Sequence, residues 1–583
     1  MLRVFKNLKK KDLLYILISV GFIVAQVWLD LKMPDYMTEI TQLVQTPGHE
    51  MDEVLLAGGK MLACALGSLV AAVCVSVLAA RIATDFGFDL RDKLYHKVLS
   101  FSKAEISKFS TASLITRTTN DVMQVQMLII MGMQSIIKAP LMGTWAVIKI
   151  AGKNTEWMIS TAVAVICLLL VVMVCVGLML PKFRRVQKLT DDLNRVTREN
   201  LNGLRVIRAY NAEEYQEEKF DKVNSALTDA HLFTGRVSAF VTPTIQLIMN
   251  TLSLAIYWVG AALINNTGAT EKLGMFSDMI VFSQYAMQVV MAFMMLVMLF
   301  VMLPRAAVSA KRILEVLDTP ISVIDGTMSR DSAANRGEIE FKNVSFRYPG
   351  AEEDVLQNIS FKAHKGETVA IIGSTGSGKS TLIDLLPRFY DVTDGEVMID
   401  GVNVKEYTLK TLRNKIGYVS QKAMLFSGTV RSNIVFGDSG HDLEQNFVES
   451  VYTAQATDFV EKMEGGYDGT IAQGGTNLSG GQKQRLSIAR AICRRPEILI
   501  FDDSFSALDY KTERLLRQKL NQDCDKITKL IVAQRIGSIR DADRIIVLDE
   551  GKMVGCGTHE ELMESCEVYR QIAYSQLSKE ELS

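Results

Sequence analysis

The sequence predicts an α-helical transmembrane domain fused to a soluble α/β domain. Apolar residues make up 48% of its 583 residues and crowd the part before about residue 310. Several runs there reach the roughly 20 residues that a helix needs to cross a hydrocarbon core of about 30 Å. From Gly337 onward the pattern changes to strand-like alternation, a continuous apolar strand, a glycine-rich turn and a helix. A chain of this length also exceeds one ordinary domain.

Six apolar runs are candidate membrane spans. They are Leu14 to Leu31, Val54 to Ala80, Met127 to Ile150, Met158 to Leu180, Thr244 to Ile264 and Met279 to Leu303. The first is not expected to be a cleaved signal peptide, because no small-residue cleavage pattern follows it.

The placement of lysine and arginine predicts the orientation of these spans. The N-terminal leader and the segments 81–126 and 181–243 are basic, and they alternate with short loops poor in net positive charge. Positive residues favour the cytosolic side, so both termini and the α/β domain are expected in the cytosol, at the plasma membrane. The two long basic segments have helical periodicity and few Gly or Pro residues. We therefore expect them to extend the membrane helices rather than form solvated loops.

Ionisable residues inside spans are costly in lipid. Lys60 and Lys149 lie near outer ends of their spans and are expected to snorkel. Lys138 is deeper, and it either faces a water-filled cavity or reaches the inner interface. We expect no acidic residue at mid-depth in any span, which argues against a proton-relay transporter.

The last span is rich in methionine, with glutamines on one face. Such residues could line a binding wall for varied apolar ligands, although ordinary helix packing is favoured. The residues are Gln284, Met287, Gln288, Met291, Met294, Met295 and Met298.

Charge and cysteine usage exclude two classes of site. The formal net charge is -1 without a long basic tail, so nucleic-acid binding is not expected. The eight cysteines include no CxxC pair, which indicates unpaired thiols on a reducing cytosolic side and no metal site built from cysteine.

A phosphate-binding loop follows the strand "TVAII". The residues from Gly373 match GxxxxGKS between that strand and a helix. Backbone N–H groups of such a loop, together with the helix N-terminus, bind phosphate oxygens of ATP. Lys379 would reach the outer phosphates, and Ser380 would bind Mg²⁺. The expected nucleotide-binding residues are Gly373, Ser374, Thr375, Gly376, Ser377, Gly378, Lys379, Ser380 and Thr381.

Two further residues belong to the same predicted site. The buried strand in "RRPEILIFDD" ends at Asp502, which would hold Mg²⁺ directly or through water. Tyr348 either stacks on adenine or lies on a sheet surface.

A second anion-binding turn opens the helix in "NLSGGQKQRLSIARAI", about 100 residues after the first. Each of the two phosphate-binding turns begins its own helix. Pairing of one turn with the other across a dimer is therefore the simplest arrangement.

These motifs together resemble the ATP-binding cassette (ABC) exporters, specifically half-transporters with six spans and one nucleotide-binding domain. "GSTGSGKST", "NLSGGQ", "SALD", "TASLITRTTNDV" and "ENLNGLRVIRAYNAEEY" carry the resemblance over nearly the whole chain. It implies that Tyr348 stacks on adenine and that Gln421 serves Mg²⁺ and communication. It also implies that Ser479, Gly480, Gly481 and Gln482 contact the nucleotide of the other subunit, and that Asp509 lies at the dimer seam. Short helices around Ser110 to Thr116 and Ala209 to Tyr215 would touch the nucleotide domains.

Two residues depart from the family pattern. Asp503 stands where a glutamate normally polarises the attacking water, and Gln534 stands where a histidine is normal. Aspartate is one methylene shorter, and a shift of about 1 Å in a catalytic group can cost about a hundredfold in rate. Glutamine cannot titrate or carry a positive charge. The resemblance therefore implies the degenerate-site subunit of a heterodimer whose partner has a competent glutamate and histidine.

The predicted domains are a transmembrane domain over 1–320, a linker over 321–336 and a nucleotide-binding domain over 337–583. The expected function is ATP-driven export of amphipathic or hydrophobic small molecules, with slow hydrolysis at the chain's own site. Two alternatives stay open: a homodimeric exporter of lipid or peptide, and an ATP-gated channel or regulatory membrane subunit.

Overall fold

The chain divides into a helical unit, Met1–Lys97 with Ala112–Asp318, and an α/β unit, Val98–Thr111 with Thr319–Ser583. The structure is a computed structural model, and it describes residues 2–6, 8–45, 51–151, 153–266, 268, 272–329, 336–437 and 443–576. Six residues of the predicted linker, 330–335, and the last seven residues of the chain lie outside this description.

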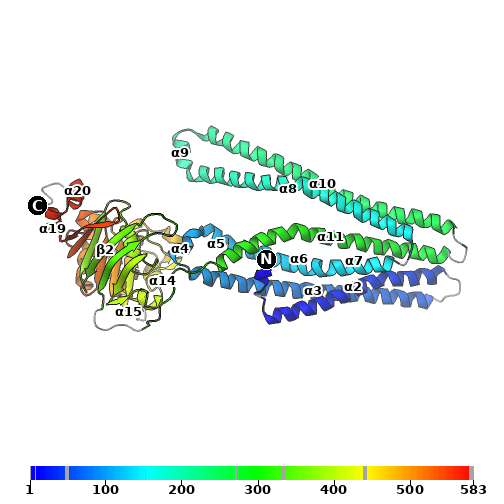
Figure 1. The fold of residues 1–583 in the computed structure, drawn as a ribbon, viewed down its shortest axis with the longest axis horizontal. Helices are drawn as coiled ribbons and strands as arrows, with labels where there is room; N and C mark the ends of the chain where they lie inside the picture. Colours follow the sequence, from blue (N-terminus) through cyan, green and yellow to red (C-terminus); the bar gives the residue numbers. More distant parts are fainter. Residues whose placement is uncertain are drawn as a thin grey trace. The chain divides into compact units, whose positions relative to one another are not determined.

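Long helices make up the first unit (Figure 1). They are α1 (Leu2–Phe5), α2 (Lys10–Gln45), α3 (Met51–Leu99), α5 (Thr111–Thr118), α6 (Asn120–Gly132), the π-helix η1 (Met133–Lys138), α7 (Ala139–Ile150), α8 (Thr155–Asn202), α9 (Leu204–Ala209), α10 (Glu213–Asn266) and α11 (Lys272–Leu317).

Within the described residues, six helical stretches are long and apolar enough to cross a membrane, and each contains one of the six predicted runs. The prediction of six spans is therefore confirmed. α8 has 48 residues, which at 1.5 Å per residue is about 70 Å, far more than a hydrocarbon core requires. It packs along α10 (Figure 1). The basic segments thus continue the spans as helices, as their periodicity predicted.

Two ion pairs join α2 to the third span. Lys138, the last residue of η1, lies 3.2 Å from Asp30, and the two side chains are 16% and 20% exposed. Ser68 of α3 also hydrogen-bonds Asp30. Farther along α2, Asp35 accepts from Lys149 at 2.7 Å and from the hydroxyl of Tyr285 on α11 at 2.6 Å. These contacts join four of the six candidate spans.

The expectation of no acidic residue at mid-depth in any span stays a prediction, but α2 carries two acidic residues at and beyond the end of its predicted apolar run. The apolar run stops near Leu31, but the helix continues to Gln45, so Asp30 and Asp35 lie well inside it. A charge in such a position is retained when a partner compensates it. Lys138 is that partner for Asp30, an arrangement that neither alternative for Lys138 included.

The Asp30–Lys138 pair gives a test of this interpretation. Asp30→Asn leaves a half-buried ammonium without its counter-charge and should lower the free energy of unfolding by about 2 kcal/mol. The double variant Asp30→Asn/Lys138→Met removes both charges and should recover most of the loss. Thermal unfolding in detergent measures both. Glu218→Gln is the control, because its pair with Lys222 is exposed and should contribute little. Additive losses in the double variant would contradict compensation.

The methionines of α11 divide between two environments. Met294 and Met295 pack against the core of the helical unit, whereas Met291 and Met298 are 45% and 60% exposed within this chain. Helix packing therefore explains part of the methionine pattern. The exposed members remain candidates for contact with a ligand, lipid or partner.

The α/β unit contains short helices and twelve named strands in its described residues. The strands are β1 (Ile339–Phe346), β2 (Leu356–Ala363), β3 (Thr368–Gly373), β4 (Asp394–Ile399), β5 (Val402–Asn403), β6 (Ile416–Val419), β7 (Gly428–Thr429), β8 (Thr470–Ile471), β9 (Ile498–Asp502), β10 (Thr528–Val532), β11 (Arg544–Asp549) and β12 (Lys552–Gly557). The α-helices are α4 (Lys103–Lys108), α12 (Lys379–Asp384), α13 (Leu409–Asn414), α14 (Val430–Ile434), α15 (Leu443–Thr453), α16 (Thr457–Val460), α17 (Gly480–Cys493), α18 (Tyr510–Asp523), α19 (His559–Ser565) and α20 (Glu567–Gln576); the 3₁₀ turns are η2 (Gly466–Asp468), η3 (Gln473–Gly475) and η4 (Ile536–Ser538).

The main sheet has six strands in the order β12-β11-β3-β10-β9-β6. From β11 to β6 the strands pair in parallel, and β12 closes one edge antiparallel. β9 is buried on both faces: Ile498 and Ile500 pack into one core, and Leu499 and Phe501 into the other. Burial on both faces explains why this strand is a continuous apolar run instead of an alternating one. A second, four-stranded sheet has the order β2-β1-β4-β5.

Candidate functional site: a phosphate-binding loop beside paired carboxylates

The glycine-rich loop lies between the end of β3 and the start of α12. Gly373 must be glycine, because a Cβ there would lie 2.0 Å from the carbonyl oxygen of Leu548. Gly378, the residue before α12, has φ +95°, a conformation that favours glycine. Together these residues bring the backbone close around the point where the helix begins, as a phosphate site requires.

Lys379 folds back over this loop. Its ammonium donates to the carbonyl oxygens of Gly373 at 2.9 Å and Ser374 at 2.6 Å. Burial lowers the pKa of Lys379, while the nearby Asp503 and Asp502 act in the opposite direction. The ammonium of Lys379 therefore lies against the loop, and its contact with the outer phosphates stays a prediction.

Asp502 completes the loop from the neighbouring part of the sheet. The hydroxyl of Ser380 donates to its Oδ1 at 2.8 Å. Asp502 is 7% exposed, and burial raises its pKa, with Asp384 among the groups that add to the effect. The two predicted Mg²⁺ ligands are thus adjacent, and their hydroxyl and carboxylate oxygens are the donors that Mg²⁺ prefers.

Asp503 is held by two side-chain amides. Its Oδ2 accepts from Gln534 at 2.8 Å and from Gln421 at 3.2 Å. It is 8% exposed and has φ +48°, a rare conformation for a residue other than glycine. Burial raises the pKa of Asp503, whereas the hydrogen bond from Gln421 lowers it. Both departures from the family pattern therefore lie in contact with each other. Gln421 also hydrogen-bonds Asp503, and its predicted role toward Mg²⁺ stays a prediction.

Tyr348 lies beside the start of α12. Its hydroxyl is 2.8 Å from Thr381 Oγ1, and its ring packs edge-on against Tyr390. This position next to the loop agrees with the adenine-stacking alternative. The half-buried ring is also part of the packing around Phe346, so the stacking role stays a prediction.

The second anion-binding turn opens α17. Ser479 accepts from the N–H of Gln482, and the Gln482 side chain accepts from the N–H of Ser479, so the pair forms a capping box. Gly481 approaches the Ala507 carbonyl oxygen, where a Cβ would lie at 3.2 Å, while Gly480 has open space around it. Asp509 caps the next helix, α18, by accepting from Thr512. Contact of these residues with a second subunit's nucleotide stays a prediction.

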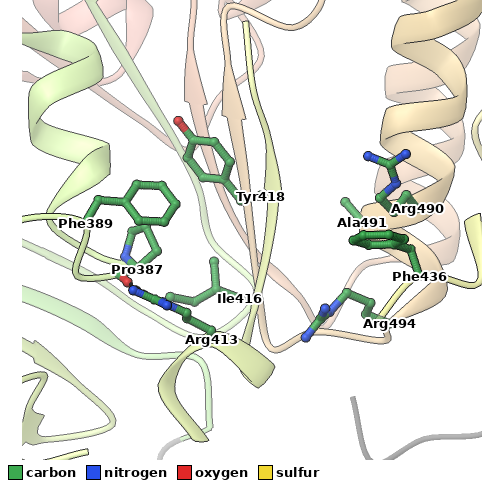
Figure 2. Close-up of a pocket in the computed structure, with 9 residues that line it drawn as sticks. All are labelled: Pro387, Phe389, Arg413, Ile416, Tyr418, Phe436, Arg490, Ala491 and Arg494. Carbon is green, nitrogen blue, oxygen red and sulfur yellow. Dashed lines mark hydrogen bonds between the residues drawn. The ribbon is translucent and has the colours of Figure 1, made fainter. Parts of the chain in front are cut away.

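A separate pocket lies between β6 and α17. Figure 2 shows Phe389, Pro387 and Arg413 on one side of it and Phe436 and Arg490 on the other. Burial lowers the pKa of Arg490 to about 10. The pocket thus combines aromatic rings with guanidinium groups, and it is distinct from the phosphate-binding loop.

Sequence reasoning missed three residues near the site: Lys103, Asp384 and Tyr418. Lys103 follows Ser102 in α4, and a serine followed by a glutamate three residues later was the available signal for that helix. α4 belongs to the α/β unit, whereas α5, beginning at Thr111, lies mostly in the helical unit. Contact of the predicted segment Ser110 to Thr116 with the nucleotide domains stays a prediction. Docking of Ala209 to Tyr215 stays a prediction.

A phosphate-binding loop closed by a serine–aspartate contact, in a chain with six candidate spans, defines a membrane protein with a P-loop nucleotide-binding domain. Models of the ABC transporter transmembrane region and of the ABC transporter match residues 15–308 and 356–506. The chain belongs to the ABC transporter family and has the architecture of its half-transporter exporters. It is a multi-pass membrane protein, and its ABC ATPase domain implies ATP binding and ATP-driven transport.

Its relatives include proteins with and without a stated substrate. An uncharacterized ABC transporter ATP-binding protein of Mycobacterium tuberculosis is 40% identical over 523 residues, which cover 89% of this chain and 87% of that protein. The ATP-dependent lipid A-core flippase of Pseudomonas fluorescens is 33% identical over 488 residues, 83% of this chain and 79% of that protein. The structure of a bacterial Atm1-family ABC exporter with ATP bound has a similar fold, with a TM-score of 0.77, 23% identity and coverage of 96% and 98% of the two chains.

The role of Tyr348 can be tested with two variants. If the ring stacks on adenine, Tyr348→Phe should keep ATP affinity near that of the unchanged protein, and Tyr348→Ala should lose about tenfold to a hundredfold. Titration with a fluorescent ATP analogue measures both. Tyr452→Ala, at an exposed tyrosine of α15, is the control. Equal losses in the Phe and Ala variants would assign the role to the hydroxyl bond with Thr381 instead.

Proposed function

We propose that this chain is one subunit of a heterodimeric ABC exporter that moves amphipathic or hydrophobic small molecules, and that its own ATP site is degenerate. The observation that carries the proposal is the hydrogen bonding of the Asp503 carboxylate. One of its two carboxylate oxygens accepts hydrogen bonds from two amides, those of Gln421 and Gln534. A carboxylate held in this way is a poor base for an attacking water, and glutamine can neither supply a proton nor bear a charge.

Nucleotide binding is retained in this proposal. Gly373 to Thr381 form the phosphate-binding loop, with Lys379 for the outer phosphates and Ser380, Gln421 and Asp502 for Mg²⁺. The adjacency of Ser380 and Asp502 supports the metal assignment. Binding without fast hydrolysis suits a site that stays closed while another site turns over.

The competent site lies on a partner half-transporter with a glutamate and a histidine at the positions of Asp503 and Gln534. Residues 479–482 of this chain would complete that site, and Asp509 would lie at the seam. ATP drives transport only if it binds the closed state more tightly than the open one. Closure would then switch the spans from inward-facing to outward-facing, with both termini and the nucleotide-binding domain in the cytosol of a cell whose plasma membrane holds the spans.

The domain assignment in this proposal is a transmembrane domain over 1–320, a linker over 321–336 and a nucleotide-binding domain over 337–583. The exposed methionines of α11, Met291 and Met298, together with Gln284, support a substrate that is apolar with some polar groups. A lipid, which is also apolar with some polar groups, would fit the same surface.

A second candidate function is a homodimeric lipid exporter. It is favoured by the 33% identity with the lipid A-core flippase over most of both chains. In a homodimer both ATP sites would carry Asp503 and Gln534, so transport would rely on two weakened sites.

Restoration of the two family residues tests the degenerate site. Asp503→Glu/Gln534→His should raise the ATPase rate of the purified chain by about tenfold to a hundredfold, because the longer acid reaches the attacking water. The variant should also gain a pH dependence near 6.5 from the new histidine. Asp541→Glu, an added methylene at an exposed position, is the control.

Robust, transport-competent turnover by the unchanged chain alone would contradict the heterodimer and favour the second candidate. An unchanged rate in the double variant, with ATP still bound, would contradict the degenerate assignment of Asp503 and Gln534.

The raised pKa of Asp503 adds a pH signature to the slow hydrolysis at this site. Asp503 loses its base form as pH falls through the raised pKa. The acid limb of the rate–pH profile, where the hydrolysis rate falls, should therefore lie at a higher pH than the pKa range of an exposed aspartate. A rate–pH profile of the unchanged chain measures this limb. Asp503→Asn should abolish the limb along with the residual rate, whereas a limb that persists in Asp503→Asn would belong to another group.

A further inference from the structure

α4 is a short helix in the segment that joins the second and third spans, and it folds onto the α/β unit. Ser102 and Glu105 form a capping box at its start. Glu105 also accepts from the N–H of Ser322 at 3.1 Å, and Ser102 Oγ lies 3.0 Å from Ser322 Oγ. Burial acts to raise the pKa of Glu105, but these hydrogen bonds outweigh it and lower the pKa. α4 therefore has a fixed place on the unit that carries the phosphate-binding loop.

Lys103 extends from α4 to the far end of the helix that begins at the loop. Its ammonium lies 2.8 Å from both carboxylate oxygens of Asp384, the last residue of α12. It also lies over the ring of Phe389, 4.7 Å from the centroid. Asp384 is only 7% exposed. A carboxylate buried to this extent needs a counter-charge, and Lys103 provides one.

Asp384 lies four residues after Ser380 in α12, and Ser380 hydrogen-bonds Asp502. Asp384 accepts from the hydroxyl of Tyr418 at 3.3 Å. The Tyr418 ring packs edge-on against Phe389 at 5.5 Å, and Figure 2 shows the two rings on the same side of the arginine-lined pocket. Burial raises the pKa of Tyr418, with Asp384 and Asp502 adding to the effect, so the hydroxyl keeps its proton and donates. Burial is the main cause that raises the pKa of Asp502; Asp384 adds to this effect, and Lys103 opposes it.

We propose that Lys103 is a positioning residue for the metal–nucleotide site, whose ammonium neutralises Asp384 and so sets the negative charge around Asp502. The inference rests on the proposed role of Asp502 as a Mg²⁺ ligand. When α4 is docked, Asp384 is compensated. When α4 moves away, the two buried carboxylates, Asp384 and Asp502, lose that cation.

The change in charge has opposite effects on the two ligands of the site. More negative charge repels the phosphates of ATP and attracts a divalent cation. Coupling between α4 and the site must also be reciprocal, so the metal-free nucleotide and the metal alter the docking of α4 in opposite directions, each by the factor by which docking alters its own affinity. The docking of α4, in the segment between the second and third spans, therefore depends through charge on which ligand the site holds.

The test uses the full-length chain in detergent and measures the two ligands separately. Lys103→Met should weaken binding of a fluorescent ATP analogue in EDTA by about threefold to fivefold, as expected for one unit charge nearby in a partly screened site. The same variant should tighten binding of Mn²⁺, followed by its paramagnetic signal, by a similar factor. Lys108→Met, which removes an exposed lysine from the same helix, should change neither.

A second variant separates charge from structure. Lys103→Met/Asp384→Asn removes both members of the pair and should return both affinities toward those of the unchanged chain. Weaker binding of both ligands in Lys103→Met would show a structural role only and would overturn the inference, as would unchanged affinities. The variant Asp502→Asn tests the proposed role of Asp502 as a Mg²⁺ ligand. If it leaves Mn²⁺ binding intact, the assignment of Asp502 fails, and the inference fails with it.

Discussion

The site depends on a hydrogen bond between two elements that are far apart in sequence: Ser380 at the start of α12 donates to Asp502 at the end of β9. This contact forms because β3, β10 and β9 are successive parallel strands, so their carboxyl ends meet at one edge of the sheet. Ligands of open α/β sheets bind at that edge. The phosphate-binding loop, Asp502 and Asp503 are all placed by this one constraint.

In the proposed degenerate site, the same constraint separates catalysis from nucleotide binding. Asp503 follows β9 directly and takes φ +48°, so its side chain leaves the strand in a direction fixed by the backbone. The length of that side chain alone decides how far the carboxylate reaches. The side chain of aspartate is one methylene shorter than that of glutamate, and the Asp503 carboxylate accepts hydrogen bonds from Gln534 and Gln421. The loop residues are unaffected by this change, because they hydrogen-bond among themselves and with Asp502.

Local patterns carried much of the prediction from sequence. Glycine spacing located the loop at Gly373 to Ser380, and the apolar run of β9 located Asp502, because both depend on a few consecutive residues. Hydropathy located the six spans for the same reason. Contacts between distant segments were not accessible: Lys103 and Asp384 are separated by almost half of the chain, and no local pattern pairs them. Hydropathy likewise could not show that Lys138 lies beside Asp30, because the two residues are distant in the sequence.

The central claim is that the loop of this chain holds an ATP that is hydrolysed slowly while a partner's ATP turns over. The most direct measurement is the identity of the nucleotide on each subunit during turnover, obtained by photo-crosslinking of an azido-ATP in the purified complex. The account predicts intact ATP on this chain through many cycles and ADP on the partner. ADP that appears on this chain at the overall rate of turnover would contradict it.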